Sequence, residues 1–483
     1  MAGIAILKPR ADILGKRSAI VNALKKLVPA RCIVEDEAGR RAFETDALTA
    51  YKQMPLAVVL PTTTEEVSRV LSFCHLAGVR VVARGAGTSL CGGALPAEDA
   101  IVLGLSRMNR VLEVNLESRY IRVETGITNL GVSRSVAPTN FFYAPDPSSQ
   151  LACTIGGNIA MNSGGAHCLK YGVTVNNVLG LKMVMMNGDI VELGGTHLDA
   201  SGYDLLPLVI GSEGQMGIVT EATLRILRNA EGARPMMLGF DSSEAAGACV
   251  SAIIAQGIVP VAIEFMDKPA IKVCEEFAHA GYPLDVEALL IIEVEGSEAE
   301  IANLLGQIDR IAWDFAPKFV KRSESEAESA AIWKGRKAAF GAIGRISDYY
   351  CMDGVIPLSK LTQALSGIAE ICAKHRLQVA NIFHAGDGNL HPLILYNAND
   401  PDEKARAELA GEEILTLCVE LGGCLTGEHG VGIEKRELMS TQFNDVDIAQ
   451  QMRVKSVFDP DWLLNPGKVF PLKAQEAFLA RVR

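Results

Sequence analysis

Glycine is distributed unevenly along this chain, and that distribution limits what the chain can fold into. Twenty of the 45 glycines fall between Gly85 and Gly217, about 15% of that stretch against about 7% of the remaining residues. Because glycine lacks a Cβ, a segment so rich in it lets the backbone approach a ligand closely. We therefore expect this region to form loops around a bound group.

The length of the chain predicts more than one domain. Its 483 residues exceed what one hydrophobic core usually supports. Apolar residues make up 49% and charged residues 21%, as in an ordered globular protein. We predict a first domain over residues 1–230, a second domain over 231–455 where the glycine content becomes ordinary, and a C-terminal segment over 456–483 that returns to the first domain.

Charge and cysteine content exclude several classes of protein. A net charge of -11 argues against nucleic-acid binding, which needs a clustered positive surface. The eleven cysteines are scattered and nowhere form CxxC, which argues against an iron–sulfur cluster in this chain and against a disulfide framework. No segment offers about 18 uninterrupted apolar residues, so we expect no direct membrane insertion. We predict a cytoplasmic protein that reaches the inner face of the membrane only through partners.

Hydrophobic periodicity predicts an α+β fold. In the first domain, a helix capped by Thr62 or Thr63 with Glu65 or Glu66 connects two strands, and Asn187-Gly188 predicts a hairpin. The expected strands of this domain are 57–60, 79–83, 100–105, 111–115 and 120–126. The second domain should contain strands 261–265, 288–296, 351–357, 379–383 and 391–396 and helices 299–312, 323–340, 359–375 and 402–421. This order predicts an antiparallel sheet covered by helices on one face.

The segment ARGAGTSLCGGAL (83–95) has the glycines that a phosphate-binding loop needs and follows a predicted strand. It lacks the third glycine of the GxGxxG fingerprint and leads into another strand rather than a helix. Alone, it fits nucleotide binding and a tight connection between strands equally well. The further loops APDPSS (144–149), TIGGNIAMNSGG (154–165), KYG (170–172) and GSEGQMGIVT (211–220) favour one nucleotide site built from several loops.

These loops resemble those of a known family. The matching segments are PTTTEEV, RGAGTSLCGGAL, YAPDPSS, TIGGNIAMNSGG, GSEGQMGIVTEATL and LLNPGKVF. They resemble the flavin-binding domain of the vanillyl-alcohol-oxidase/p-cresol-methylhydroxylase superfamily, in its FAD-linked 2-hydroxyacid dehydrogenase branch. Longer runs such as FHAGDGNLHPLILYNAND are similar to the FAD subunits of bacterial glycolate oxidases. The resemblance implies an α+β protein with a two-lobed FAD-binding domain and a cap domain whose antiparallel sheet is covered by helices.

The resemblance also implies an FAD site in the glycine-rich domain. Some relatives attach the flavin through a histidine in the first loop, where this chain has Thr88 and Ser89, so dissociable FAD is expected. The expected FAD-binding residues are Pro61, Arg84, Gly85, Ala86, Gly87, Thr88, Ser89, Leu90, Gly92, Pro145, Asp146, Ser148, Gly156, Gly157, Asn162, Gly164, Gly165, Glu213, Gly217, Ile218, Val219, Thr220 and Asn465.

Two of the eight histidines fall within IFHAGDGNLHPLILY (382–396). Glycines between them oppose a helix, so NIFH and HPLILY are predicted strands of a hairpin that places His384 and His391 at facing ends. Cross-strand neighbours come within reach of one metal ion. Two ligands are too few, and a pair of polar residues that closes a hairpin is the alternative.

A third candidate ligand lies in LTGEHGVGIEKR (425–436), where Glu428 and His429 stand between glycines. Two histidines and a carboxylate suit zinc or manganese and leave coordination positions open. Both segments match the HxGDGNxH and GEHG motifs of the same branch. The resemblance implies that His384, His391 and Glu428 bind a divalent metal, zinc first and manganese or iron as alternatives. It also implies that His429 is the base near the substrate, with a purely structural histidine as the alternative.

The carboxylate of a hydroxy acid calls for a guanidinium group. By the resemblance Arg336 binds it, with Lys337 and Arg345 as further candidates and a surface arginine as the alternative. Cys351 stands where members that oxidise 2-hydroxyglutarate place a lysine, and Pro392-Leu393 follows the second metal histidine in place of Leu-Asn. These departures favour a small monocarboxylate.

The predicted activity is FAD-dependent, metal-assisted oxidation of glycolate to the 2-oxo acid, with D-lactate or D-2-hydroxyglutarate as alternative substrates. The resemblance implies a separate iron–sulfur or other electron-acceptor subunit as the partner. Two other classes stay open: a metal hydrolase that uses only the second domain, and a flavin-bearing electron-relay subunit without substrate chemistry of its own.

Overall fold

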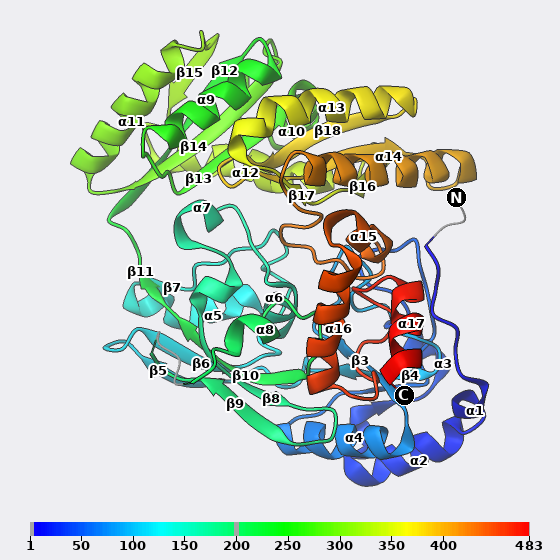
Figure 1. Cartoon of the computed structure of the whole chain (residues 1–483). Coiled ribbons are helices and arrows are strands. Elements are labelled where there is room, and N and C mark those ends of the chain that lie inside the picture. Colours follow the sequence, from blue (N-terminus) through cyan, green and yellow to red (C-terminus); the bar gives the residue numbers. More distant parts are fainter. Residues whose placement is uncertain (1–3, 198–201, 483) are drawn as a thin grey trace. The chain divides into compact units, whose positions relative to one another are not determined.

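The structure is a computed structural model that describes residues 4–197 and 202–482 (Figure 1). Residues 1–3, 198–201 and 483, which fall within the predicted domains, lie outside the described residues. The chain forms two compact units. The glycine-rich unit contains Ile4–Gly164, Val173–Arg228 and residues 428–482, and the nine-stranded unit contains Gly165–Gly172 and Asn229–Gly427.

The boundaries of these units differ from those of the expected domains. Residues Gly165–Gly172 belong to the nine-stranded unit, which was not expected. The chain returns to the glycine-rich unit at residue 428, whereas residue 456 was predicted. Hydrogen bonds explain the return: the Gly427 amide donates to Asp353 of the nine-stranded unit, whereas the Val431 amide donates to Glu213 of the glycine-rich unit. The backbone therefore changes partners between Gly427 and Val431.

A four-stranded sheet forms the first lobe of the glycine-rich unit. Its order is β1 (Ile33–Val34), β2 (Ala57–Val59), β4 (Ala100–Gly104) and β3 (Arg80–Arg84), and β4 runs parallel to both β2 and β3. Helix α4 (Thr64–Ala77) connects β2 to β3, with β4 inserted between them. The Thr63 hydroxyl accepts a hydrogen bond from the Glu66 amide, and Gly78 ends the helix at φ +65°. The predicted helix cap is therefore confirmed.

A five-stranded antiparallel sheet forms the second lobe. Its order is β5 (Val111–Asn115), β6 (Tyr120–Glu124), β10 (Ile218–Arg225), β8 (Val178–Val184) and β9 (Ile190–Gly194). β8 and β9 form the predicted hairpin, where Gly188 adopts φ +95°. Each of the two sheets lines its own apolar core, so the expected two-lobed arrangement is confirmed.

The last part of the chain also lies in the glycine-rich unit. Helices α16 (Asp445–Phe458) and α17 (Leu472–Val482) flank a segment in which Leu464 pairs with Val81 of β3. The buried ammonium group of Lys455 binds Asp459, which accepts hydrogen bonds from the Leu463 and Leu464 amides. The C-terminal segment therefore completes the four-stranded lobe.

Nine strands form the sheet of the other unit. Their bounds are β12 (Gly232–Phe240), β13 (Ala262–Asp267), β14 (Ala288–Gly296), β15 (Phe319–Arg322), β16 (Asp348–Cys351), β17 (Gly354–Val355), β18 (Gln378–His384), β19 (Asn389–Leu390) and β20 (Pro392–Tyr396). The order is β15-β12-β14-β13-β18-β19-β17, and β20 pairs with both β18 and β16. Every pairing is antiparallel, as predicted.

Helices cover both faces of this sheet, and the expectation of a single covered face was wrong. Leu289 and Ile291 of β14 belong to a core that α10 and α12 complete, whereas Leu290 and Ile292, on the other face, are equally buried. Alternate strand residues point to opposite faces, so burial of all four requires two covering layers. The helices of this unit are α9 (Ser243–Ala255), α10 (Lys268–Ala278), α11 (Glu298–Trp313), α12 (Glu326–Ile343), α13 (Leu361–Lys374) and α14 (Pro401–Glu420).

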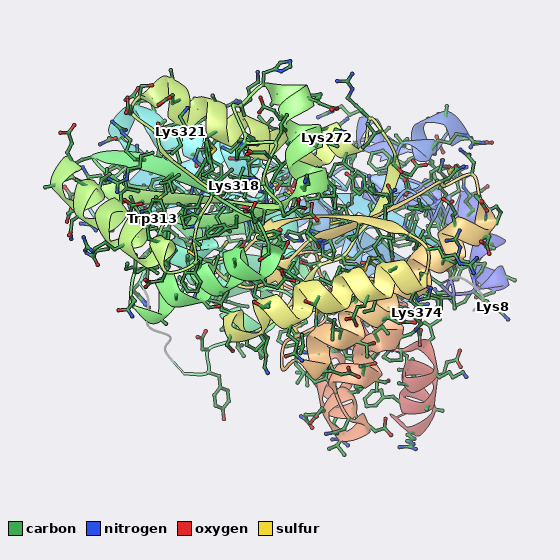
Figure 2. All side chains as sticks on the ribbon, turned by 90° about the horizontal axis from the view of Figure 1, so that it is seen from above. Lys8, Lys272, Trp313, Lys318, Lys321 and Lys374 are labelled. Atoms are coloured by element: carbon green, nitrogen blue, oxygen red, sulfur yellow. The ribbon has the colours of Figure 1, made fainter. Side chains whose placement is uncertain are left out.

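The surface of the nine-stranded unit mixes charges of both signs. Lys318 lies beside Asp241 and Asp285, and Trp313, at the end of α11, is 61% exposed (Figure 2). Within the part of the chain that the structure describes, no helix is both long and apolar enough to cross a membrane.

Shorter elements complete the described chain. They are α1 (Ala11–Leu14), α2 (Arg17–Leu27), α3 (Glu37–Arg41), α5 (Asn129–Val136), α6 (Ile155–Met161), α7 (Cys168–Tyr171), α8 (Leu206–Val209), α15 (Met439–Gln442), β7 (Phe141–Phe142) and β11 (Leu227–Arg228).

Candidate functional site

The two histidines of the hairpin are not cross-strand partners, so this detail of the prediction was wrong. His384 ends β18 and pairs with Asn389, because Gly388 at φ +78° closes the turn after four residues. His391 falls at the break between β19 and β20, where the chain changes partner strands.

The two imidazoles nevertheless meet. Their ring centroids are 5.3 Å apart at 88°, and both side chains are buried. One nitrogen of each ring is held by an acceptor: His384 Nδ1 lies 2.7 Å from Glu264 Oε1, and His391 Nδ1 lies 3.3 Å from the Met352 carbonyl oxygen. Contacts of this kind fix a histidine so that its other nitrogen can bind a metal. The donor set therefore fits a divalent cation.

Glu264 connects His384 to the predicted substrate arginine. Its Oε2 accepts from Arg336 Nε at 2.7 Å and lies 2.6 Å from Arg336 Nη2, while Oε1 holds His384. The Glu264 side chain is fully buried. Burial alone would raise the pKa of Glu264, but Arg336 and His384 outweigh burial and hold this pKa below its usual value.

Sequence reasoning missed Glu264. The other residues of the predicted strand 261–265 are apolar, and a carboxyl among buried apolar residues requires a partner. That requirement was the available signal. The partners themselves could not be identified from the sequence, because Arg336 and His384 are 72 and 120 residues away.

Of the three basic candidates on α12 and after it, only Arg336 lies with the histidines. Lys337 is exposed, with its Nζ 5.7 Å from the centre of the Trp333 ring. Arg345 is also exposed and lies over Phe277. Residues adjacent on a helix face different directions, so burial of Arg336 turns Lys337 away.

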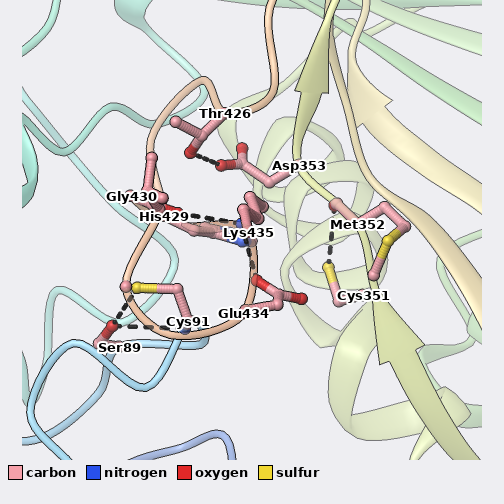
Figure 3. A network of polar contacts seen from close by, with 12 residues as sticks. Ser89, Cys91, Cys351, Met352, Asp353, Thr426, His429, Gly430, Glu434 and Lys435 are labelled. Atoms are coloured by element: carbon pink, nitrogen blue, oxygen red, sulfur yellow. Dashed lines mark hydrogen bonds and ion pairs between the residues drawn. The ribbon is translucent and has the colours of Figure 1, made fainter. Parts of the chain in front are cut away.

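Asp353 organises the neighbourhood of His391, and it too was missed. The expected strand 351–357 is broken into β16 and β17, and Asp353 occupies the break. Its Oδ1 accepts from Asn389 Nδ2 at 3.1 Å, and its Oδ2 accepts from the Gly427 amide and from the Thr426 hydroxyl (Figure 3). One fully buried carboxylate thus joins the hairpin to the loop that precedes Glu428.

Glu428 and His429 are the first two residues after the nine-stranded unit. The His429 Nε2 lies 3.9 Å from Glu428 Oε1, and both side chains are largely buried. Further along this loop the Lys435 ammonium donates to the Gly430 carbonyl and pairs with Glu434 (Figure 3). The roles of Glu428 as third metal ligand and of His429 as base stay predictions.

The expected FAD loops come together within the glycine-rich unit. A Cβ at Gly85 would collide with the Thr154 hydroxyl, and Gly87 adopts φ +76°. Thr154 in turn caps α6 by accepting from the Gly157 amide. The first loop can approach the start of α6 this closely because Gly85 has no side chain, and such a glycine cradle suits a pyrophosphate. The arrangement fits FAD.

Two expected FAD residues have structural tasks. The Glu213 carboxylate accepts from the Val431 and Gly432 amides, and the Asn465 amide donates to the carbonyl oxygens of Glu213 and Gly93. Their polar atoms thus hold the loops in place, and direct contact with FAD stays a prediction.

Lys468 was not predicted. Its buried ammonium group donates to the Gly93 and Leu95 carbonyl oxygens and to Asn465. Burial lowers the pKa of Lys468 to about 7. Through these hydrogen bonds, Lys468 connects the C-terminal segment to the glycine loop.

The remaining expected FAD residues lie in the same unit except one. The Pro145 carbonyl oxygen accepts from Asn129, the Thr220 hydroxyl contacts that of Thr64, and Gly165 is the first residue of the excursion into the nine-stranded unit. The other members, which are Pro61, Arg84, Ala86, Thr88, Ser89, Leu90, Gly92, Asp146, Ser148, Gly156, Asn162, Gly164, Gly217, Ile218 and Val219, all belong to the glycine-rich unit.

Two family models match the chain. The FAD binding domain covers residues 55–194, and the C-terminal domain of FAD linked oxidases covers residues 230–469. The glycolate oxidase subunit GlcD of Escherichia coli K12 is 48% identical over 94% of this chain and 91% of its own. The GlcD subunit of Bacillus subtilis is 38% identical over 92% and 95%, and a D-lactate dehydrogenase of Anaerostipes hadrus is 31% identical over 93% and 97%.

Solved structures show the same fold. A 4-ethylphenol oxidase from Gulosibacter chungangensis superposes with a TM-score of 0.79 at 17% identity, over 96% of this chain and 99% of that one. A p-cresol methylhydroxylase superposes with a TM-score of 0.80 at 15% identity, over 96% and 98%. The chain is an FAD-dependent oxidoreductase and belongs to the family of FAD linked oxidases that includes the GlcD subunits.

Proposed function

We propose that this protein oxidises a small 2-hydroxy acid, glycolate or D-lactate, to the 2-oxo acid with a non-covalently bound FAD. The observation that carries the proposal is the 48% identity to a GlcD subunit of glycolate oxidase along 94% of the chain. D-lactate dehydrogenases match at 31% and 33% identity, which keeps D-lactate as the second substrate. D-2-hydroxyglutarate is disfavoured because Cys351 and Leu393 stand where the resemblance places a lysine and an asparagine that would bind a second carboxylate.

A divalent metal is part of the proposal. His384, His391 and Glu428 would hold it, and zinc suits two imidazoles and one carboxylate, with manganese or iron as alternatives. When bound, the cation supplies Lewis-acid polarisation of the substrate hydroxyl. The buried pair of imidazoles, each with one nitrogen held, supports this assignment.

Substrate binding and proton transfer are assigned to other side chains. The guanidinium group of Arg336 binds the substrate carboxylate, and its pairing with Glu264 keeps it beside His384. An imidazole nitrogen of His429 accepts the proton of the substrate hydroxyl. FAD, held by the loops around Gly85 and Thr154, supplies the acceptor for the hydride that leaves the α-carbon.

We further propose that a separate subunit with an iron–sulfur or other acceptor takes the electrons onward. The relative from Escherichia coli is itself named a subunit of glycolate oxidase, which supports this partner. We place the protein in the cytoplasm, where contact with the membrane would run through that partner.

Anaerobic titration of the purified flavoprotein with glycolate, D-lactate and D-2-hydroxyglutarate tests the proposal. We expect glycolate or D-lactate to bleach the flavin, and we expect prior chelation to prevent bleaching until zinc is restored. Protein that carries no flavin would favour the metal hydrolase. Flavin that none of the three acids reduces, with zinc present, would favour an electron-relay subunit.

A further inference from the structure

One carboxylate in the nine-stranded unit contacts two of the side chains to which the proposed function gives separate tasks. Glu264 lies opposite His384 in the register of β13 and β18, and Arg336 reaches it from α12. The carboxylate contacts the imidazole through Oε1 and the guanidinium through Oε2. Three elements far apart in the sequence thus converge on a residue outside the predicted site.

We propose that Glu264 is a positioning residue that sets the direction of the His384 ring and of the Arg336 guanidinium together. The inference rests on the proposed function, in which His384 binds the metal and Arg336 binds the substrate carboxylate. Because both contacts are made by one rigid carboxylate, the metal and the substrate carboxylate are located relative to each other by Glu264.

The geometry supports both halves of this role. A histidine whose Nδ1 hydrogen-bonds to a carboxylate is fixed in tautomer and orientation, which presents Nε2 to a cation. The Arg336 contacts use Nε and Nη2, one edge of the planar guanidinium fork, so the orientation of the whole fork is defined. Glu264 and His384 are joined through the strand ladder itself, which leaves little freedom for either.

A glutamine at this position can satisfy only one of the two contacts. Its amide keeps one oxygen acceptor and replaces the other with an NH2 donor, which opposes a donor on the imidazole or on the guanidinium. For Glu264→Gln we therefore expect the dissociation constant for zinc to rise roughly 10- to 100-fold. We also expect the KM for the hydroxy acid to rise, because Arg336 loses its fixed direction. FAD content should not change.

Asp267 provides a matched control on the same strand. It is also a buried carboxylate, and it accepts from the Asn381 backbone amide and side chain at 2.8 Å and from the Ala270 amide. None of these partners is a predicted ligand or substrate residue. Asp267→Asn should lower the melting temperature and leave the zinc dissociation constant and the KM near their wild-type values.

The experiment compares four proteins as FAD-loaded full chains: wild type, Glu264→Gln, Asp267→Asn and His384→Ala. Zinc dissociation constants are measured by competition with a chromophoric chelator, and KM and kcat by steady-state kinetics. Glu264→Asp, which keeps the charge on a shorter side chain, replaces the glutamine variant if that variant does not fold.

The outcomes separate this inference from the proposed function. If His384→Ala binds zinc as the wild type does, the proposed metal site is wrong. If His384→Ala loses zinc while the Glu264 variant keeps the wild-type dissociation constant, or changes it no more than Asp267→Asn, the positioning role is wrong. Weaker zinc binding and a higher KM in the Glu264 variant, but not in Asp267→Asn, would support the positioning role.

Discussion

A histidine binds a cation well when the protein holds the other ring nitrogen, and His384 and His391 both meet that condition. Glu264 holds the first ring and the Met352 carbonyl holds the second. These contacts differ in kind, since a carboxylate raises the basicity of an imidazole more than a carbonyl does. Of the proposed ligands, His384 is therefore the one whose loss should matter most.

We predict that His384→Ala abolishes hydroxy-acid-driven flavin reduction and leaves FAD bound. The substitution removes a proposed ligand from the nine-stranded unit, whereas the FAD loops belong to the glycine-rich unit. Anaerobic stopped-flow absorbance and the flavin-to-protein ratio provide the measurement. His375→Ala, which removes a histidine paired with Glu413 near the end of α13, is the control and should reduce normally. Unchanged turnover in His384→Ala would refute the metal assignment.

The buried Lys468 gives stability a pH dependence of known sign. Its pKa is lowered to about 7 in the folded protein, below the unfolded value of about 10.4. Between these values the unfolded chain carries a proton that the folded protein does not bind, so stability rises with pH by up to about 1.4 kcal/mol per unit.

We predict that Lys468→Met removes this contribution. From pH 7.5 to 9 the wild type should gain up to about 2 kcal/mol of unfolding free energy that the variant does not gain. Urea unfolding at both pH values, with fixed excess FAD, measures the difference. Equal pH slopes in the two proteins would show that Lys468 stays protonated in the fold.

Residue patterns predicted which positions would be buried but not what they would touch. His384, His391 and Arg336 could be proposed from motifs and from resemblance. Glu264 could not, because its partners are fixed by strand register and by the docking of α12, neither of which a local pattern contains.

At the scale of elements, the break between β16 and β17 matters more than either strand. A continuous strand over 351–357 was expected from its apolar residues, yet the chain leaves the ladder to place Asp353 among three donors. A buried carboxylate needs such donors, and Asp353 receives them from Asn389, Thr426 and Gly427. A strand whose ladder runs without a break, such as β14 over 288–296, was predicted to the residue.

We predict that Asp353→Asn loosens the loop that leads to Glu428. The asparagine NH2 group would face a donor, which leaves one buried group unsatisfied at a cost of about 1–3 kcal/mol. Hydrogen exchange at the Gly427 amide should quicken, and zinc should bind more weakly. Asp348→Asn on β16, whose carboxylate accepts from Ala398 at an exposed site, is the control. Slow exchange retained at Gly427 in the Asp353 variant would contradict the role given to this carboxylate.

At the scale of the whole molecule, the FAD loops and the two proposed metal histidines belong to different units, while the third proposed ligand, Glu428, belongs to the unit of the FAD loops. The FAD loops around Gly85 and Thr154 lie in the glycine-rich unit, and the two histidines lie in the nine-stranded unit. The glycine pattern predicted the first unit, and the strand and helix order predicted the second. Neither pattern showed that the chain changes units at Gly164 and Gly427, since those crossings depend on hydrogen bonds to distant residues such as Glu213.

We predict that chelation removes the metal without releasing FAD. The histidines and the flavin loops share none of the hydrogen bonds described above, so loss of the cation should leave the glycine cradle intact. Metal analysis and the flavin spectrum after desalting with a chelator measure the two contents. Flavin lost in proportion to metal would contradict this separation. As a control, chelation is carried out at a pH at which the histidines are not protonated, so that acid cannot cause the loss of metal or FAD.

The pairing of Leu464 with Val81 has a consequence for synthesis on the ribosome. β3 is translated early, but the residues that complete its lobe, among them Asn465 and Lys468, are translated much later. The glycine loop is therefore translated nearly four hundred residues before the side chains that hydrogen-bond to it. A polypeptide that stalls before these residues should therefore expose this lobe to proteases and chaperones, and FAD should be captured only after they have been translated.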